Sequence, residues 1–231
     1  MWHQSIRAIE KHRKIKDFKG DYMSNKDYNA TVKNYIFDFG NVIAQFYPEK
    51  LTAPYVSDEK TKNYIADIVF DRLYWDKLDW GTITDDEVKE SIRNRVPDEL
   101  KDIACTVYDN WVNNLIPVQG MEKLIQDIHK SGKKMYLLSN ISKGFEEGYS
   151  NVEWINNLFG CFDGLVLSGP IGIAKPCVDV FEYLLKKYGL NREECLFIDD
   201  NEMNIEGAKK ANIKGYLFDG DAEKLREYIE L

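Results

Sequence analysis

The feature that most constrains this chain is a repeated alternation between short apolar runs and segments with helical periodicity. The apolar runs have the length of strands and occupy residues 35–39, 134–139, 165–168, 195–198 and 216–218. Between them, apolar side chains recur three and four residues apart, as in Met121, Leu124, Ile125 and Ile128 before Gly132. Strands covered on both faces read as continuous apolar runs. The alternation therefore predicts an α/β fold, a Rossmann-like doubly wound parallel sheet with helices on both faces.

Residues 48–115 interrupt this alternation, because they separate the first two strands by far more residues than one crossover helix needs. Only helical patterns occur here, for example Tyr64, Ile65, Ile68, Val69 and Leu73. We predict an inserted α-helical cap domain at 48–115 and a core domain formed by 32–47 and 116–231. The predicted cap holds nine Lys and Arg against fifteen Asp and Glu, so it suits a small monophosphate better than a polyanion.

Composition excludes several classes of protein. The formal net charge of -8 argues against nucleic acid or an anionic membrane as a partner. No apolar run approaches the length of a membrane span. The four cysteines show no C-x-x-C spacing, which argues against a zinc site or a disulfide framework. A reducing compartment, and so a cytoplasmic location, is the expectation that fits this cysteine pattern.

The segment 1–31 differs from the rest of the chain. It includes the basic run RAIEKHRKIKDFK and lacks the apolar centre of a secretory signal. We predict that it is a poorly ordered N-terminal extension. A targeting arm is the alternative, and Met23 is an alternative start.

Polar side chains follow four of the predicted strands. Asp38 ends the first run, Ser139 and Asn140 end the second, Lys175 follows the third, and Asp199 with Asp200 ends the fourth. The carboxyl ends of parallel strands meet at one edge of a sheet, so these side chains should converge. Taken singly, Ser139 could be a helix cap, Lys175 a solvated surface residue, and the paired aspartates a helix N-terminus. Their order along the chain favours a common site.

This set of residues suits phosphoryl transfer. Clustered carboxylates repel one another unless they are protonated or hold a cation. Oxygen ligands without a neighbouring His or Cys favour Mg²⁺ as that cation. Asp38 would attack phosphorus to give an aspartyl-phosphate, which water then hydrolyses, while Lys175 and the metal offset the charge repulsion. Ser139 would hydrogen-bond a phosphoryl oxygen, and the expected ligand is a small phosphorylated metabolite, such as a sugar phosphate.

The same residues lie in four ordered motifs: IFDFGNVI, LLSN, AKP and FIDDNEMNIEGAKKANI. Together they resemble the haloacid dehalogenase superfamily of phosphohydrolases, over residues 33–220 and including the position of a helical cap. The sequences DFGNV and DDNxxNIEGA are similar to the motifs of the branch that contains α-D-glucose-1-phosphate phosphatase. The resemblance implies a phosphatase in which Asp38, Ser139, Lys175 and Asp200 are catalytic. It also implies that Ser139, Asn140, Lys175 and Asn41 contact the phosphate, and that Asp38, Asp199, Asp200 and the carbonyl of Gly40 hold Mg²⁺.

Gly40 departs from the family pattern. Most phosphatases that this chain resembles carry a second Asp there, which protonates the leaving group and then activates water. General acid–base assistance is worth about 10²- to 10⁴-fold, or roughly 3 to 5 kcal/mol of barrier. From the sequence alone, we expect a substrate whose leaving group needs little protonation, such as an anomeric sugar hydroxyl. Rate should then depend steeply on leaving-group acidity.

Two alternatives remain beside this interpretation, and a third, a protein kinase, is dismissed. The DFG triplet also occurs in protein kinases, but no Gly-rich loop or HRD motif accompanies it. A dehalogenase would use Asp38 and Lys175 without a metal, and its turnover would not need Mg²⁺. A catalytically impaired binding or regulatory protein is favoured only by Gly40, and it would bind a phosphorylated ligand without turnover.

Overall fold

The computed structural model describes residues 15–16, 22–23 and 31–231. A short antiparallel pair, β1 (Ile15–Lys16) and β2 (Tyr22–Met23), precedes the folded body. The rest of the segment 1–30, for which we predict poor order, lies outside the described residues. Within the described chain, no helix combines the length and the apolar character that crossing a bilayer requires.

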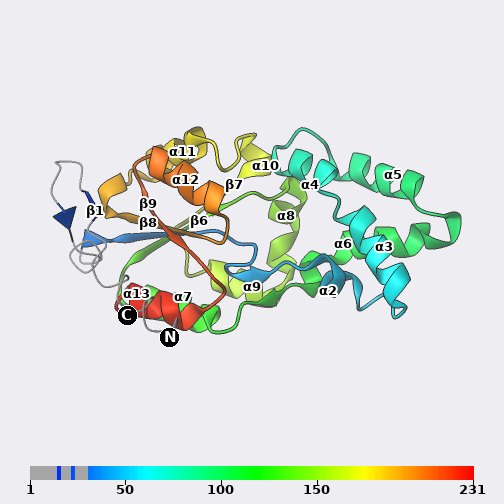
Figure 1. Cartoon of the computed structure of the whole chain (residues 1–231), viewed down its shortest axis with the longest axis horizontal. Helices are drawn as coiled ribbons and strands as arrows, with labels where there is room; N and C mark the ends of the chain where they lie inside the picture. The colour runs from blue at the N-terminus through cyan, green and yellow to red at the C-terminus, as the bar shows by residue number, and fades with distance from the viewer. Residues whose placement is uncertain (1–14, 17–21, 24–30) are drawn as a thin grey trace, which may run out of the picture.

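A five-stranded parallel sheet forms the centre of the fold (Figure 1). Its strands are β3 (Asn34–Phe37), β6 (Lys134–Ser139), β7 (Gly164–Leu167), β8 (Cys195–Asp199) and β9 (Lys214–Leu217). Their order in space is β7-β6-β3-β8-β9, so the first strand is central and the chain winds outward to both sides. In register, Phe37 lies opposite Leu137 on one side and Ile198 on the other. The predicted doubly wound sheet is confirmed.

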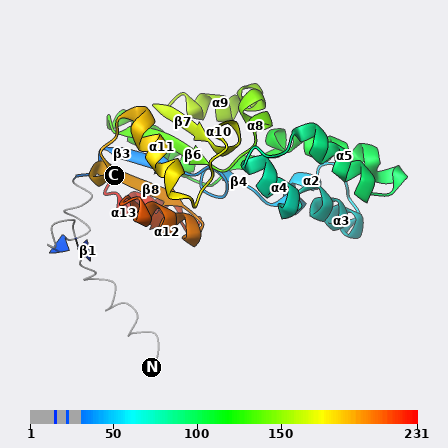
Figure 2. The same cartoon turned by 90° about the horizontal axis from the view of Figure 1, so that it is seen from above.

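Helices cover both faces of the sheet (Figures 1 and 2). One face carries α7 (Met121–Lys130), α9 (Glu153–Phe159) and α13 (Ala222–Tyr228), and the other carries α11 (Val178–Tyr188) and α12 (Glu202–Lys210). Successive residues of β3 point to opposite faces, so Tyr35 and Phe37 pack in one apolar cluster and Ile36 in the other. The four apolar residues predicted to share one face of α7 are all fully buried.

Residues 48–115 form a helical insert between β4 (Ala44–Gln45) and β5 (Ile116–Pro117), which pair antiparallel. The insert contains α2 (Pro48–Thr52), α3 (Glu59–Val69), α4 (Arg72–Asp79), α5 (Asp85–Arg95), η2 (Asp98–Leu100), α6 (Lys101–Asn110) and η3 (Val112–Asn114). It extends from one end of the sheet (Figure 1). An aromatic cluster of Phe46, Phe70, Trp75 and Trp111 joins it to the core, where Trp111 stacks on Phe145 with 5.9 Å between ring centroids.

The remaining elements connect the strands on the core side. They are α8 (Lys143–Gly148), η4 (Tyr149–Asn151), α10 (Ser168–Ile171) and η5 (Arg192–Glu194). Leu73 does not continue the helical pattern of α3 but lies on α4, where it is exposed. The helix α11 begins at Val178 with Cys177 as its N-cap, and the preceding Lys175–Pro176 peptide bond is cis.

Candidate active site

The sequence-predicted residues meet at the carboxyl edge of the sheet. Asp38 follows β3 directly, Ser139 is the last residue of β6, and Asp199 is the last residue of β8. The parallel register aligns the ends of these three neighbouring strands. Each of the three residues is buried, although each is polar. Buried polar groups need partners, so this edge must be organised by specific contacts.

Lys175 supplies the central contact. Its Nζ lies 2.7 Å from Oδ1 of Asp38 and 2.7 Å from Oδ2 of Asp199, and only 1% of its side chain is exposed. An ammonium has three N–H donors, and these two contacts use two of them. The third is available to an oxygen bound in front of Asp38. The alternative that Lys175 is a solvated surface residue is therefore excluded.

Asp199 is held from several sides. Its Oδ1 accepts hydrogen bonds from the backbone N–H of Asn201 at 2.8 Å and from Nδ2 of Asn204 at 3.0 Å, and Nδ2 also approaches Oδ2 at 3.1 Å. Asn201, and neither aspartate, is the N-cap of α12. With Lys175 on Oδ2 as well, the carboxylate of Asp199 is fixed in orientation and its charge acts mainly on Lys175.

Two asparagines position neighbouring groups. The Asn140 side chain donates to the carbonyl of Lys175 and accepts from its N–H, both at 2.8 Å, and so fixes the loop that carries the lysine. Asn41 has a φ of 55°, a left-handed conformation that Asn tolerates well. Its Oδ1 accepts from the N–H of Phe46 at 2.9 Å, and its side chain also hydrogen-bonds Asp200. Both amides, expected from the resemblance to contact phosphate, thus hold parts of the site in place.

The site has excess negative charge. Burial raises the pKa of Asp38 to about 7, and the neighbouring charge of Lys175 offsets only part of this effect. Burial, followed by the charge of Asp199, also raises the pKa of Asp200. Burial alone would lower the pKa of Lys175, but Asp199 and Asp38 outweigh it, so the pKa is raised and the ammonium stays charged. One lysine cannot balance three carboxylates.

These residues fit a hard divalent cation. Asp38, Asp199 and Asp200 each offer one carboxylate oxygen within 4.8 Å of the others. The donor set contains oxygen alone, which Mg²⁺ prefers over softer metals. After Lys175 is counted, two negative charges remain unbalanced at this edge. A divalent cation would balance them.

Gly40 lies in the same cavity as Asp38 and next to it in space. A Cβ built on Gly40 would meet no atom within 4 Å, and the backbone is outside the left-handed region that favours glycine. The acid that is absent at this position is therefore not excluded by steric conflict. An aspartate could be introduced there without backbone strain.

A cavity of about 380 Å³ opens in front of these groups. Its floor comes from the core and includes Asp38, Gly40, Ser139, Asn140, Lys175 and Asp200. Its opposite wall comes from the insert and from the segments that lead into it, and it comprises Phe46, Arg72, Trp75, Asp76, Asp79, Trp80, Trp111 and Leu115. The cavity therefore places a bound molecule between the two parts of the fold.

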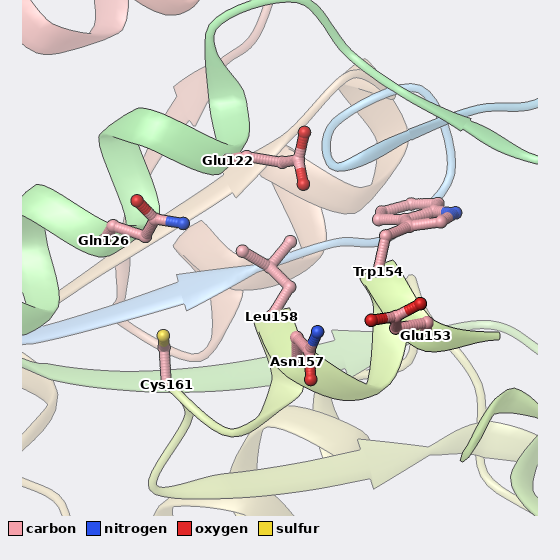
Figure 3. A pocket seen from close by; sticks show the side chains of 7 residues that line it. All are labelled: Glu122, Gln126, Glu153, Trp154, Asn157, Leu158 and Cys161. Carbon is pink, nitrogen blue, oxygen red and sulfur yellow. The ribbon is translucent and has the colours of Figure 1, made fainter. Parts of the chain in front are cut away.

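A second cavity, of about 460 Å³, lies between α7 and α9 (Figure 3). It is lined by Glu122, Gln126, Glu153, Trp154, Asn157, Leu158 and Cys161. Two of these side chains are carboxylates and none is basic, so the cavity does not suit a phosphate. This cavity is therefore not a candidate for the chemistry above.

Sequence reasoning missed two residues of the site. Asn204, which fixes Asp199, lies inside the fourth motif but had no assigned role. Its place on the buried face of α12, five residues after Asp199, was the available signal. Asp79 of the insert faces the cavity, but nothing in its local pattern separates it from the other acidic residues of the insert.

Comparison with known proteins agrees with this geometry. The family model of haloacid dehalogenase-like hydrolases matches residues 32–212. A sesquiterpene phosphatase of Aspergillus oryzae is 23% identical over 186 residues, which are 80% of this chain and 89% of that protein. The D-ribitol-5-phosphate phosphatase of Bacteroides thetaiotaomicron is 24% identical over 205 residues, which are 85% of this chain and 96% of that protein.

Solved structures show the same fold. A haloacid dehalogenase family enzyme of Bacteroides thetaiotaomicron, in complex with magnesium and inorganic phosphate, superimposes with a TM-score of 0.61 at 23% identity. The similarity covers 84% of this chain and 98% of that one. The family match spans strands β3, β6, β7 and β8, the insert, and the four motifs up to Asn212. This chain therefore belongs to the haloacid dehalogenase-like hydrolases.

Proposed function

We propose that this hydrolase is a Mg²⁺-dependent phosphatase that acts on a small phosphorylated metabolite. The observation that carries the proposal is the ammonium of Lys175, buried and 2.7 Å from both Asp38 and Asp199, at the floor of a cavity that also contains Ser139 and Asp200. This arrangement offers a carboxylate nucleophile, a fixed positive charge and a hydroxyl donor on one side of a bound phosphoryl group. Relatives named as phosphatases support it.

In the first step, an oxygen of Asp38 attacks phosphorus and the ester oxygen leaves, which gives an aspartyl-phosphate on Asp38. Lys175 donates its free N–H to a phosphoryl oxygen and reduces the repulsion between the carboxylate and the phosphate. The hydroxyl of Ser139 donates to another phosphoryl oxygen. In the second step, water attacks phosphorus and Asp38 is released as a carboxylate. Asn140 and Asn204 keep Lys175 and Asp199 in position throughout.

Asp38, Asp199, Asp200 and the carbonyl of Gly40 would hold Mg²⁺. When bound, the cation neutralises charge on the phosphoryl oxygens and on the carboxylates. The cluster of three carboxylates supports this assignment.

Removal of the metal is therefore expected to stop the reaction. Hydrolysis of p-nitrophenyl phosphate should fall by at least about 10³-fold in excess chelator and return when Mg²⁺ is restored, because Lys175 alone leaves the site too negative for a phosphate dianion. The release of p-nitrophenolate measures this directly. Undiminished activity in chelator would contradict the mechanism and would favour a dehalogenase-type hydrolase. Binding of phosphate without turnover in any metal would favour an impaired binding protein.

The substrate is proposed by class. The acidic insert and a cavity of about 380 Å³ support a small monophosphate in preference to a polyanion. A sugar 1-phosphate, as in the glucose-1-phosphate phosphatase branch, is one candidate, and the aromatic wall of Trp75, Trp80 and Trp111 could contact a sugar face or an apolar chain. All four cysteines are free, which supports a cytoplasmic location. The insert would act as a cap that closes over the substrate.

A further inference from the structure

One carboxyl group of the active-site cavity has no role in the mechanism above. Asp79 is the last residue of α4, and it lines the cavity from the insert, opposite the core residues that include Asp38 and Lys175. Its side chain is partly buried and makes no hydrogen bond or ion pair with any residue that the structure describes. A partly buried carboxyl without a partner is costly, which suggests a role with a bound molecule.

The fold fixes Asp79 in front of the core. The chain turns at Gly81, just after α4, with a φ of 63°. A Cβ on Gly81 would lie 2.3 Å from the carbonyl oxygen of Gly169, so this turn packs directly against α10. Within α4, Trp75 and Leu78 are buried. The end of α4 is thus held between the aromatic cluster and the core, which gives Asp79 a defined position over the cavity.

The charges around Asp79 favour its protonated form. Burial raises the pKa of Asp79 to about 7. Arg72 and Lys175 lower that pKa, whereas Asp76 and Asp38 raise it. Arg72 is mostly occupied by Asp76, which it contacts at 2.9 Å on the exposed side of α4. The C-terminal end of a helix also disfavours a negative charge.

The direction of the reaction places the leaving group on the insert side of the cavity, where Asp79 lies. Attacking and leaving oxygens lie roughly in line through phosphorus. Asp38 attacks from the core, so the leaving oxygen points away from Asp38, toward the insert. The core position from which related phosphatases are expected to protonate it holds Gly40, which has no side chain to do so.

We propose that Asp79 is the proton donor to the leaving group, in place of the acid absent at position 40. This role rests on the phosphatase function proposed above. As Asp38 forms its bond to phosphorus and the ester bond breaks, the carboxyl proton of Asp79 passes to the departing oxygen, and the product leaves as an alcohol. In the second step the Asp79 carboxylate takes a proton from the attacking water. Phosphate and the Asp38 carboxylate are released, and Asp79 is again protonated.

The first test compares esters with graded leaving-group acidity. With Asp79 in place, kcat/KM of the wild type should vary little between p-nitrophenyl phosphate and primary-alkyl phosphates. In Asp79→Asn, kcat/KM should fall by about 10²- to 10³-fold for alkyl esters and by less than about tenfold for p-nitrophenyl phosphate, whose leaving group needs no proton. Asp67→Asn removes a charge from the exposed side of α3, outside the cavity, and should leave kcat/KM of all esters unchanged.

A pH profile separates proton donation from a structural effect. The donor works in its protonated form, so kcat/KM for an alkyl ester should decline as pH rises above about 7 in the wild type and in Asp67→Asn. Asp79→Asn should lose this decline, because an amide does not titrate.

Gly40→Asp provides a rescue, because the structure leaves room for that side chain. Placed in the Asp79→Asn protein, it should restore alkyl-ester turnover by at least about tenfold, since a carboxyl within reach of the leaving oxygen again supplies a proton. In the wild type, Gly40→Asp should raise alkyl-ester turnover by a smaller factor, because Asp79 already supplies the proton.

The outcomes separate the two proposals. If the wild type hydrolyses p-nitrophenyl phosphate but Asp79→Asn slows all esters equally and keeps the alkaline decline, the role of Asp79 is wrong and the phosphatase function stands. A steep dependence of the wild-type kcat/KM on leaving-group acidity would also overturn the role of Asp79. It would favour a substrate whose leaving group needs no proton donor. A wild type that hydrolyses no phosphate ester with any divalent metal would overturn both proposals.

Discussion

Replacement of Asp38 by Asn is expected to lower kcat for every phosphate ester by about 10⁴-fold or more, the scale of loss seen when a nucleophile is removed. An amide oxygen is a poor nucleophile, and it cannot form the aspartyl-phosphate. The amide is also a weaker ligand for a divalent cation than the carboxylate. Steady-state assays with p-nitrophenyl phosphate, at saturating Mg²⁺, measure this loss.

The fold should survive that change. Asn has the same shape as Asp, and Lys175 keeps its contact with Asp199 at 2.7 Å. The midpoint of thermal unfolding should therefore stay close to that of the wild type. Asp67→Asn, on the exposed side of α3, is a matched control and should retain full activity. An Asp38→Asn protein with wild-type kcat would refute the role of Asp38 as nucleophile.

Replacement of Lys175 by Met should damage both stability and activity. Lys175 is the buried partner of two carboxylates, and removal of one member of a buried ion pair typically costs about 3 to 5 kcal/mol, because the remaining charges lose their partner. The free energy of unfolding from urea titration should fall by this amount. Turnover should fall as well, because no fixed cation faces the phosphoryl group.

An exposed ion pair provides the comparison for Lys175. Lys143 lies 3.6 Å from Glu147, and about 70% of its side chain is exposed. Lys143→Met should change the free energy of unfolding by less than about 1 kcal/mol, since solvent screens such pairs. Equal stability losses in the two variants would show that the buried pair does not organise the site.

The five strands could be predicted because a parallel sheet covered on both faces needs unbroken apolar runs. The ends of two strands differ from the prediction. The predicted strands include Phe39 and Ser168, but β3 ends at Phe37 and Ser168 begins α10, since the chain already turns there to form the site. Asp38, Ser139, Lys175 and Asp199 could be placed together because the topology brings these strand ends to one edge.

The contribution of the insert could not be predicted in the same way. The packing of α4 on α10, which brings Asp79 over the cavity, depends on contacts between segments far apart in sequence. The same is true of the side chains of Asn140 and Asn41, which hold Lys175 and Asp200 in place. A sequence motif identifies residues that lie near the reacting atoms, but the hydrogen bonds of these residues determine which of them contact the substrate.

The most direct test of the account is to trap the phosphoryl group on the enzyme. With p-nitrophenyl phosphate and Mg²⁺, the first step is fast because the leaving group is good, so the aspartyl-phosphate should accumulate during turnover. Borohydride reduces an acyl phosphate to an alcohol, and mass spectrometry of the digested chain then locates the modified residue. We predict modification at Asp38, dependent on both substrate and metal. Sustained turnover with no modification at Asp38, or with modification at another residue, would contradict the account.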